Sequence, residues 1–257
     1  MQGEITGGGS PLDGDGLLAE ASEQLRAAAG DARVKAVLLQ IDSPGGGLAA
    51  SDQLHHEVEK LGRTGKPVVA WAGGVMASGG YYLAAAASGI MAGPTAVVGS
   101  IGVVMNHFQA AGLLRWLGIR ADPIISGPRK DIGSPFREMT REEREILQAR
   151  VDDSHRRFVA LVAKGRKLPP EKVEELAGGD VFSAEEAREN GLVDRIGYVD
   201  DALEWLEELS GGRGMRVIGY RRPPSLYDLV GEIGEAGAAA FWKGSLAELE
   251  PAPLMGF

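Results

Sequence analysis

The fold class is decided by one stretch near the start of the chain, Val34-Lys35-Ala36-Val37-Leu38-Leu39-Gln40-Ile41-Asp42-Ser43-Pro44-Gly45-Gly46-Gly47. Residues 34–41 are a short, nearly continuous apolar run with β-branched side chains, which is typical of a strand buried on both faces of a parallel sheet. The Asp-Ser-Pro-Gly-Gly-Gly that follows predicts a turn. A helix is expected directly after this turn, over residues 48–61.

The same alternation continues on both sides of this stretch. Residues 17–29 predict a helix before it, and residues 67–72 predict a second buried strand after it. Residues 73–76 predict a turn, which leads into a helix of small side chains over residues 77–87. Strand–helix–strand–helix order implies a parallel sheet whose strands are joined by helical crossovers. The predicted fold class is therefore α/β.

The middle and the end of the chain predict shorter elements. Residues 90–106 mix short β-type segments with glycine and proline, residues 113–117 predict a helical turn, and residues 123–126 predict a short strand. Further helices are expected over residues 140–163, 171–177, 183–190 and 199–209. Two of them begin with a capping box, formed by Thr140 with Glu143 and by Ser183 with Glu186.

The composition changes near residue 211, and this change predicts the domain organisation. Residues 1–210 are expected to form one domain, and residues 211–257 a C-terminal strand, at residues 217–220, with a flexible arm. The arm ends in an apolar segment, residues 252–257, of the type that a hydrophobic groove could accept. A terminus without fixed structure is the alternative.

Composition excludes several classes of function. The formal net charge of −9 argues against a nucleic-acid partner, because such proteins usually carry a basic face. The absence of cysteine excludes disulfides, thiol nucleophiles and cysteine-based metal sites. No run of about 18 apolar residues occurs, so no segment of this chain is expected to span a bilayer. The start also lacks the features of a signal peptide, and any membrane anchor is expected outside this chain.

Ser78 is the first candidate for a catalytic group. It lies in Met76-Ala77-Ser78-Gly79-Gly80-Tyr81-Tyr82, after a predicted strand and turn and at the start of a predicted helix. The carboxyl ends of parallel strands are where such sheets bind ligands. Free N–H groups at a helix start could stabilise an oxyanion, and the glycines would let a substrate approach closely. The alternative is a serine cap followed by glycines that packing requires.

Two further segments could belong to a site. Gly45-Gly46-Gly47 could present backbone N–H groups to an anion, but it lacks the patterns of a phosphate loop and of a dinucleotide fingerprint. A plain strand–helix connection is the alternative. Lys130 could act as a base only where its surroundings favour the neutral amine. The adjacent Arg129 would favour that form and Asp131 would oppose it, and a solvated loop lysine is the alternative.

The histidines are weaker candidates for a catalytic base. They are His55, His56, His107 and His155. None of them is next to a Gly-x-Ser-x-Gly elbow or another local triad signature. We therefore interpret them as surface or packed side chains.

Four motifs, in this order and spacing, resemble the signal peptide peptidase A family of serine–lysine peptidases. They are Asp42–Gly47, Met76–Tyr82, Val98–Val103 and Lys130–Pro135. The match continues through the long helix to residues 191–194 and covers about residues 30–205. The resemblance implies a Clp/crotonase-like superhelix of βαβ units with a parallel sheet, plus the C-terminal arm. Residues 1–210 would then be the peptidase domain.

The resemblance also implies a role for each matched residue. Ser78 matches the nucleophile and Lys130 matches the general-base lysine. Gly45 matches the glycine whose N–H helps to form the oxyanion hole, and the N–H of Gly79 would be the second donor. Ser100 matches a serine that hydrogen-bonds the catalytic lysine. The residues by themselves do not pair Ser78 with Lys130 across 52 positions.

The substrates implied by the resemblance are hydrophobic peptides, such as signal peptides that remain in the membrane after protein export. An endopeptidase of this family needs no metal or organic cofactor. Its members form homo-oligomeric rings or domes, octamer-like in size, in which neighbours share residues near each site. The family is membrane-associated with an extracytoplasmic catalytic domain. This chain lacks the usual anchor, so it is expected to be soluble by itself, and a cytoplasmic relative is an alternative.

Other functions fit parts of the same sequence. A crotonase-type enzyme acting on acyl-CoA would use backbone N–H groups as an oxyanion hole without needing Ser78 or Lys130. A soluble Clp-like serine–histidine peptidase would need a histidine soon after the serine, for which His107 is the candidate. A scaffold that keeps the fold without the site is a third alternative, although all the matched residues are present.

Overall fold

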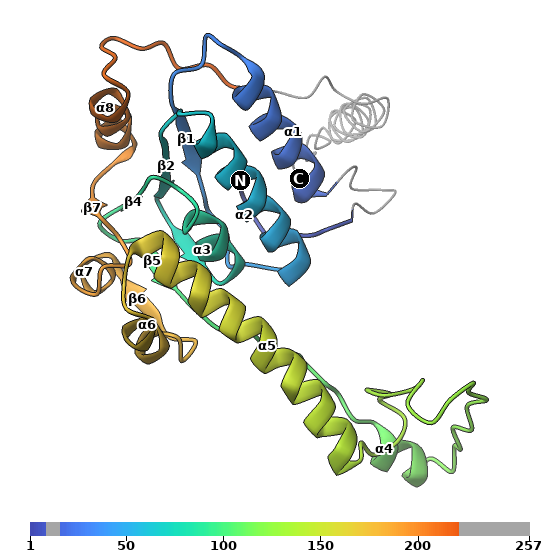
Figure 1. The fold of residues 1–257 in the computed structure, drawn as a ribbon. Helices are drawn as coiled ribbons and strands as arrows, with labels where there is room; N and C mark the ends of the chain where they lie inside the picture. Colours follow the sequence, from blue (N-terminus) through green and yellow to red (C-terminus); the bar gives the residue numbers. More distant parts are fainter. Residues whose placement is uncertain (9–15, 221–257) are drawn as a thin grey trace, which may run out of the picture.

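The computed structural model describes residues 1–8 and 16–220. Within them the strands are β1 (Val37–Gln40), β2 (Val68–Ala72), β3 (Val75–Ala77), β4 (Gly89–Ala92), β5 (Val97–Gly99), β6 (Val181–Ser183) and β7 (Arg195–Ile196). The helices are α1 (Leu17–Gly30), α2 (Leu48–Arg63), α3 (Gly79–Ala84), α4 (Ala111–Trp116), α5 (Arg141–Arg166), α6 (Pro170–Leu176), α7 (Ala184–Glu189) and α8 (Val199–Ser210). Figure 1 shows their arrangement.

The strands form two small sheets, and helices alternate with strands along the chain. The first has the order β1-β2-β4-β7 and is parallel throughout. The second has the order β3-β5-β6, in which β3 and β5 are parallel and β6 is antiparallel to β5. The α/β class with a parallel sheet, predicted from the alternation of apolar runs and helices, is confirmed.

Helices cover both faces of the first sheet, which explains why its strands are apolar on both sides. Helices α1, α2 and α3 lie on one face (Figure 1), where Leu54, Leu61 and Tyr81 are fully buried in the main core. Helix α8 packs on the other face, where Trp205 contacts the sheet residues Val69 and Met91.

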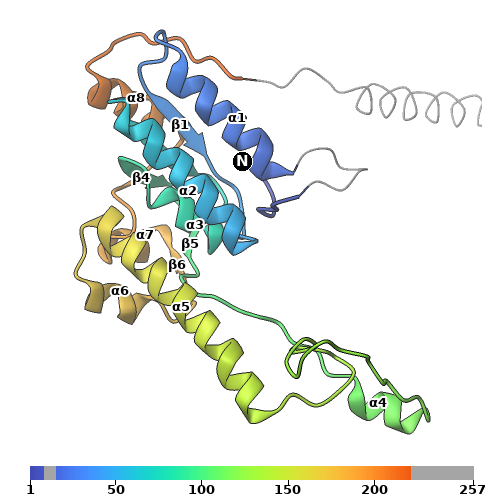
Figure 2. The same cartoon turned by 45° about the vertical axis from the view of Figure 1, so that its right-hand side comes forward.

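The long helix α5 links this body to a part of the chain that projects from it. The predicted capping box is confirmed at its start, since Glu143 N–H donates to Thr140 Oγ1 at 3.1 Å and Thr140 N–H donates to Glu143 Oε2 at 2.9 Å. Its C-terminal half buries Phe158 and Val162 in the core. Its N-terminal half leaves the body and meets residues 104–139, here called the projection, which include α4 (Figures 1 and 2).

Three local predictions were wrong. Residues 75–77 form β3, although residues 75 and 76 were predicted as a turn and residue 77 as the start of a helix, because they pair with β5 and Met76 forms a bridge with Ser43. Residues 123–126 lie in the projection as irregular chain and form no strand. Residues 217–220 also form no strand, and the Tyr220 hydroxyl instead donates to Asp31 Oδ2 at 3.1 Å. The rest of the predicted C-terminal arm, residues 221–257 with the apolar end at 252–257, lies outside the described residues.

Among residues 1–8 and 16–220, none of the helices is both long and apolar enough to cross a bilayer.

A close approach between α5 and α3 generates the first testable prediction. A Cβ added at Gly165 would lie 1.9 Å from the backbone oxygen of Ala85, whereas one added at Gly62, in α2, would meet no atom within 4 Å. Gly165→Ala should therefore lower the free energy of unfolding by about 1–3 kcal/mol or more, because the helices must separate. Gly62→Ala, the matched control, should raise it by about 0.5–1 kcal/mol. Urea unfolding of both variants measures this, and equal effects would contradict the packing.

Candidate active site

Ser78 occupies a strained turn between β3 and α3. Its backbone has φ 50° and ψ −119°, a conformation that is rare and unfavourable for residues other than glycine. Two backbone hydrogen bonds hold it there: Ser78 N–H donates to the Gly99 oxygen at 2.8 Å, and Tyr82 N–H donates to the Ser78 oxygen at 2.8 Å. Strained strand–turn–helix connections of this kind present the nucleophilic serine in α/β-hydrolases.

The glycine turn lies directly against Ser78. A Cβ at Gly45 would lie 2.7 Å from Ser78 Cβ and 2.9 Å from its Oγ, so a glycine is required at position 45. A Cβ at Gly79 would lie 3.3 Å from the Gly46 nitrogen and 2.3 Å from Ser51 Oγ. The backbones of the two segments therefore meet around the Ser78 hydroxyl.

The segment at the start of the chain decides how this glycine turn is oriented. Ile5 N–H donates to the Gly45 oxygen at 2.7 Å, and Gly47 N–H donates to the Ile5 oxygen at 2.8 Å. Gly46 lies between the two glycines that bind Ile5. In a parallel bridge of this type, the N–H of such a middle residue points away from the segment that contains Ile5. It therefore faces the side of Ser78 and Gly79.

This pairing changes the predicted oxyanion hole. Gly45 N–H donates to Ser43 Oγ at 3.1 Å, so the structure does not offer the Gly45 N–H to the site as the sequence predicts. Within the described part of the chain, the N–H groups of Gly46 and Gly79 have no hydrogen-bond acceptor. The free N–H groups beside Ser78 are therefore those of Gly46 and Gly79. Three consecutive glycines carry no signal that distinguishes them, because the distinction comes from Ile5.

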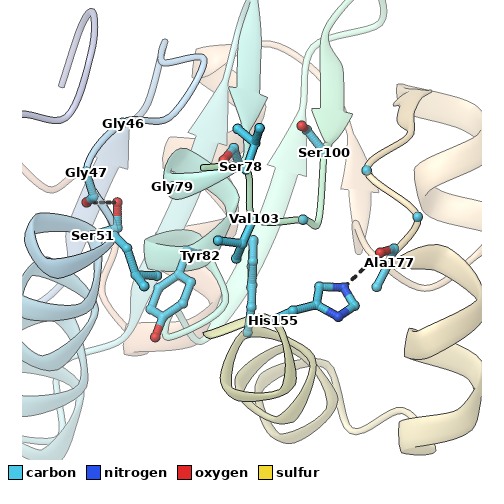
Figure 3. A pocket seen from close by; sticks show the side chains of 16 residues that line it. Gly46, Gly47, Ser51, Ser78, Gly79, Tyr82, Ser100, Val103, His155 and Ala177 are labelled. Atoms are coloured by element: carbon cyan, nitrogen blue, oxygen red, sulfur yellow. Dashed lines mark hydrogen bonds between the residues drawn. The ribbon is translucent and has the colours of Figure 1, made fainter. Parts of the chain in front are cut away.

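Ser100 lies beside Ser78 because β3 and β5 are neighbours. Ala77 is paired with Gly99, so the next residue on each strand, Ser78 and Ser100, lies at the same edge of the sheet. Ser100 also has a positive φ, 49°, and its N–H donates to the Asp180 oxygen at 2.6 Å. Figure 3 shows both serines at the carboxyl ends of their strands.

A pocket of about 610 Å³ opens beside these groups. Its polar end is formed by Ser78, Ser100 and the backbone of Gly46 and Gly79. The rest of its wall is largely apolar and comes from the start of α2, from α3, from the chain after β5 and from α5, as Leu48, Tyr82, Val103, Val104 and Phe158 (Figure 3). The arrangement can hold an apolar group beside a hydroxyl and two free N–H donors.

The sequence of the chain matches the model of peptidase family S49 over residues 60–212, which is more than half of the 257 residues. The chain belongs to peptidase family S49. S49 peptidases have the Clp/crotonase-like fold, so the fold predicted from the resemblance is confirmed.

Named relatives agree with the S49 assignment. The chain is 34% identical to Protease 4 of Salmonella typhi over 99% of this chain and 40% of that protein. It is 38% identical to a protein of Enterococcus faecium named signal peptide peptidase SppA, over 77% of this chain and 58% of that protein. A protein of Methanocaldococcus jannaschii named as a protease is 43% identical over 74% of this chain and 61% of that protein. The chain thus spans less than two thirds of the length of these relatives.

The pocket also includes His155, which the sequence did not predict as part of the site. His155, on α5, lines the pocket, and its ring Nε2 lies 2.9 Å from the Ala177 oxygen. Because a carbonyl oxygen accepts only, Nε2 carries the hydrogen of this bond. The ring therefore points to Ala177 and not to Ser78 (Figure 3). Its sequence setting, a charged helix, carries no signal of this location.

The other histidines lie elsewhere. His55 is buried in α2 with its ring edge-on to Tyr82, and burial lowers the pKa of its ring. His56 is exposed on the same helix, and His107 is in the projection. Among the described residues, no three His, Cys, Asp or Glu side chains are grouped so that they could hold a metal ion.

Tyr82 at the pocket wall is fixed by a polar cluster. Its hydroxyl donates to Asp52 Oδ1 at 2.6 Å, and Arg157 Nη2 donates to the same oxygen at 2.7 Å. Burial, with this hydrogen bond, raises the pKa of Tyr82 well above its usual range, so its hydroxyl stays protonated. Its ring packs 4.8 Å from that of Phe158, which makes Tyr82 part of the apolar wall.

Lys130 is not brought to this pocket within one chain. It is exposed on the projection, which lies at the end of α5 far from α3 in both views (Figures 1 and 2). The residues lining the pocket do not include it. The structure of a single chain therefore unites Ser78, Gly46, Gly79 and Ser100, and separates them from the predicted base.

The projection exposes many large apolar side chains. Phe108, Trp116 and Ile124 are 80%, 81% and 103% exposed, although aromatic and branched residues are usually buried. Further exposed members are Val104, Met105, Leu113, Leu117, Ile119, Ile125 and Phe136. An apolar surface of this extent marks an interaction surface.

Proposed function

We propose that this S49 chain is a serine endopeptidase in which Ser78 is the nucleophile and Lys130 the general base. The observation that carries the proposal is the position of Ser78, in a strained turn whose hydroxyl lies beside two N–H donors without acceptors. A hydroxyl next to paired free N–H groups is the arrangement that acyl transfer requires. Membership of a peptidase family supports the same reaction.

The mechanism assigns one task to each group. The neutral amine of Lys130 takes the proton from Ser78 Oγ, which attacks the carbonyl carbon of the peptide. The oxygen of the tetrahedral intermediate becomes negative and accepts hydrogen bonds from the N–H groups of Gly46 and Gly79. The ammonium of Lys130 then gives its proton to the leaving amine. Water, deprotonated by the same lysine, hydrolyses the acyl-enzyme, and Ser100 hydrogen-bonds the lysine throughout.

The base is supplied by a neighbouring subunit in this proposal. The projection carries Lys130 away from Ser78 of its own chain, and its exposed Phe108, Trp116 and Ile124 need a partner surface. A homo-oligomeric ring or dome satisfies both needs, because a head-to-tail contact repeated around a ring places each projection on the next copy. Two relatives are named a capsid assembly protease and a head-tail preconnector protein, names that fit a chain that works in assemblies.

The proposed substrates are hydrophobic peptides. The pocket next to Ser78 presents Leu48, Val103 and Phe158 to the residue that is bound there, and these favour an apolar side chain. Signal peptides left after protein export are substrates of this kind, and one relative carries the name signal peptide peptidase. Work on such substrates would place the catalytic domain at the membrane, outside the cytoplasm.

A crotonase-type acyl-CoA enzyme remains the second candidate function, because the same Gly46 and Gly79 N–H groups would serve a thioester. That reaction does not need a hydroxyl at position 78. If a fluorophosphonate labels the wild type but not Ser78→Ala, and if Ser78→Ala no longer cleaves an apolar peptide, the peptidase proposal is supported. Full peptidase activity in Ser78→Ala would refute it.

Mixing two inactive variants tests where the base comes from. Ser78→Ala and Lys130→Ala should each lose cleavage of an apolar fluorogenic peptide by at least about 1,000-fold, because the nucleophile and its base act as a unit. When the two are co-expressed, a site built from two subunits can combine an intact serine with an intact lysine. Random mixing around a ring should then recover up to about a quarter of the wild-type activity.

The control for this mixture is each variant co-expressed with a second copy of itself, which should stay inactive. Mixed oligomers of wild-type mass that show no recovery would mean that each dyad forms within one chain. His107→Ala should retain most of its activity, since the proposed mechanism gives His107 no task. A complete loss there would favour a serine–histidine peptidase.

The oxyanion hole generates a separate prediction. A Cβ at Gly46 would lie 2.2 Å from the Ile5 oxygen, at a backbone φ of +151°, so Gly46→Ala should displace its N–H from the site. We expect kcat to fall by roughly 100- to 1,000-fold, the usual effect of losing one such donor. In Gly47→Ala the Cβ would meet the same oxygen at an ordinary 3.6 Å, and activity should be near wild type. Equal activity of the two variants would exclude Gly46 as a donor.

A further inference from the structure

A cluster of three charged side chains connects the segment of Lys130 to the long helix α5. Arg137 lies between two carboxylates: its Nε and Nη2 donate to Asp131 Oδ2 and Oδ1 at 2.7 and 2.8 Å, and its Nη1 donates to Glu143 Oε2 at 2.8 Å. The Asp131 and Glu143 side chains are 14% and 6% exposed, although the projection around them is largely open to solvent. A planar guanidinium that donates one hydrogen bond to each oxygen of a carboxylate holds that carboxylate in one position.

One end of this cluster is the residue next to Lys130. Asp131 follows Lys130 directly, and short turns fix the backbone around both. Lys130 N–H donates to the Gly127 oxygen at 3.0 Å, and Ser134 N–H donates to the Asp131 oxygen at 2.9 Å. Because Lys130 and Asp131 share this short turn, holding the Asp131 carboxylate in place also holds the backbone from which the Lys130 side chain extends.

The other end of the cluster is part of a rigid helix. Glu143 is the third residue of α5, and its carboxylate also accepts the Thr140 N–H of the capping box. The same helix places His155 and Phe158 in the wall of the pocket. Arg137 thus ties the Lys130 turn to the helix whose other half belongs to the catalytic body.

Arg137 also binds the Asp131 carboxylate, which is next to Lys130 in the chain. A free Asp131 carboxylate would attract the Lys130 ammonium and favour the form that cannot accept a proton. Hydrogen bonds from Arg137 hold the pKa of Asp131 below its usual range, and those from Arg137 and Thr140 hold the pKa of Glu143 at about 2. The two carboxylates therefore stay ionised and bound to Arg137 over about pH 6 to 10, where a lysine base would be assayed.

Most of the other charged groups in the projection and in the first turns of α5 are also paired. Arg129 pairs with Glu142, Arg115 pairs with Glu138 at 2.9 Å, and Arg141 pairs with Glu145 at 2.8 Å. Arg120 and Asp122 also lie in the projection, and within residues 1–8 and 16–220 they take part in no ion pair. Asp131 is thus the carboxylate that adjoins Lys130 in the chain, and Arg137 is its ionic partner.

We propose that Arg137 is a positioning residue for the catalytic lysine, because it fixes the Lys130 turn to α5 and keeps the Asp131 carboxylate away from the Lys130 amine. The inference rests on the proposed function, in which Lys130 is the base. It gives Arg137 no contact with the substrate. Its two effects, on geometry and on the charge state of the base, can be measured separately.

The test compares variants of the full chain in cleavage of an apolar fluorogenic peptide at several pH values. Arg137→Gln should lower kcat by about 10- to 100-fold, the effect of a small misplacement of a catalytic group, with KM changed less than about threefold. The pH at which kcat/KM reaches half of its plateau should rise by about one unit, because the freed Asp131 would hold the proton on the base. Arg137→Lys, which cannot contact two carboxylates through a planar group, should restore little of the rate.

A matched control is the same substitution at Arg115, whose ion pair with Glu138 lies on the same projection with both side chains about two-thirds exposed. Arg115→Gln should leave kcat and the pH profile unchanged, since exposed ion pairs contribute little. The double variant Arg137→Gln with Asp131→Asn should return the pH profile to that of the wild type while kcat stays low. This separation distinguishes a charge effect from a loss of structure.

Different outcomes refute the proposed function and the positioning role of Arg137. Full activity of Lys130→Ala would refute the proposed function itself. Loss of activity in Lys130→Ala, with wild-type kcat and pH profile in an Arg137→Gln that assembles normally by light scattering, would refute the positioning role alone. If Arg137→Gln does not assemble, Asp131→Asn decides, because it breaks the same link and leaves Arg137 paired with Glu143. An unchanged kcat in Asp131→Asn would then overturn the inference.

Discussion

The structure depends on the contact between the backbone of Gly45–Gly46 and the turn at Ser78. A side chain at Gly45 would overlap Ser78 itself, and one at Gly46 would overlap the backbone of Ile5 on the opposite side. The glycine turn is therefore confined between two other segments of chain. This confinement keeps the Gly46 N–H directed at Ser78, and it makes the first residues of the chain part of the site although they contribute no side-chain chemistry.

The strain at Ser78 is supported by the sheet around it. Its positive φ is unfavourable, and it persists because β3 is paired with β5, because Ser78 N–H is bound to Gly99, and because α3 begins at the next residue. The same pairing brings Ser100 to the edge where Ser78 lies. Ser78, the N–H groups of Gly46 and Gly79, and Ser100 are thus all placed by backbone hydrogen bonds of the body. Lys130, the proposed base, lies on a different part of the molecule, a projection that α5 and side-chain ion pairs connect to the body.

Much of the fold could be predicted because its signals are local. The buried strands β1 and β2 come from apolar runs, and the starts of α5 and α7 come from capping boxes that the structure reproduces, with Ser183 and Glu186 at the second. The failures depend on distant partners. Residues 75–77 form a strand only because β5 and Ser43 lie beside them. Residues 123–126 and 217–220 have suitable side chains, but within the described part of the chain no strand lies beside them to pair with.

The α/β class, the capping boxes that begin α5 and α7, and the presence of Ser78 in a glycine-rich turn at the end of a strand could all be predicted from the sequence. These follow from side-chain polarity and backbone preferences within a few residues. Tertiary structure decided which of three adjacent glycines turns its N–H toward Ser78, because Ile5 binds the other two from 40 residues away in the chain. It also decided that Lys130 lies on a projection away from the body, because the long helix α5 and ion pairs such as Arg137–Glu143 join residues that are distant from Ser78 in the fold.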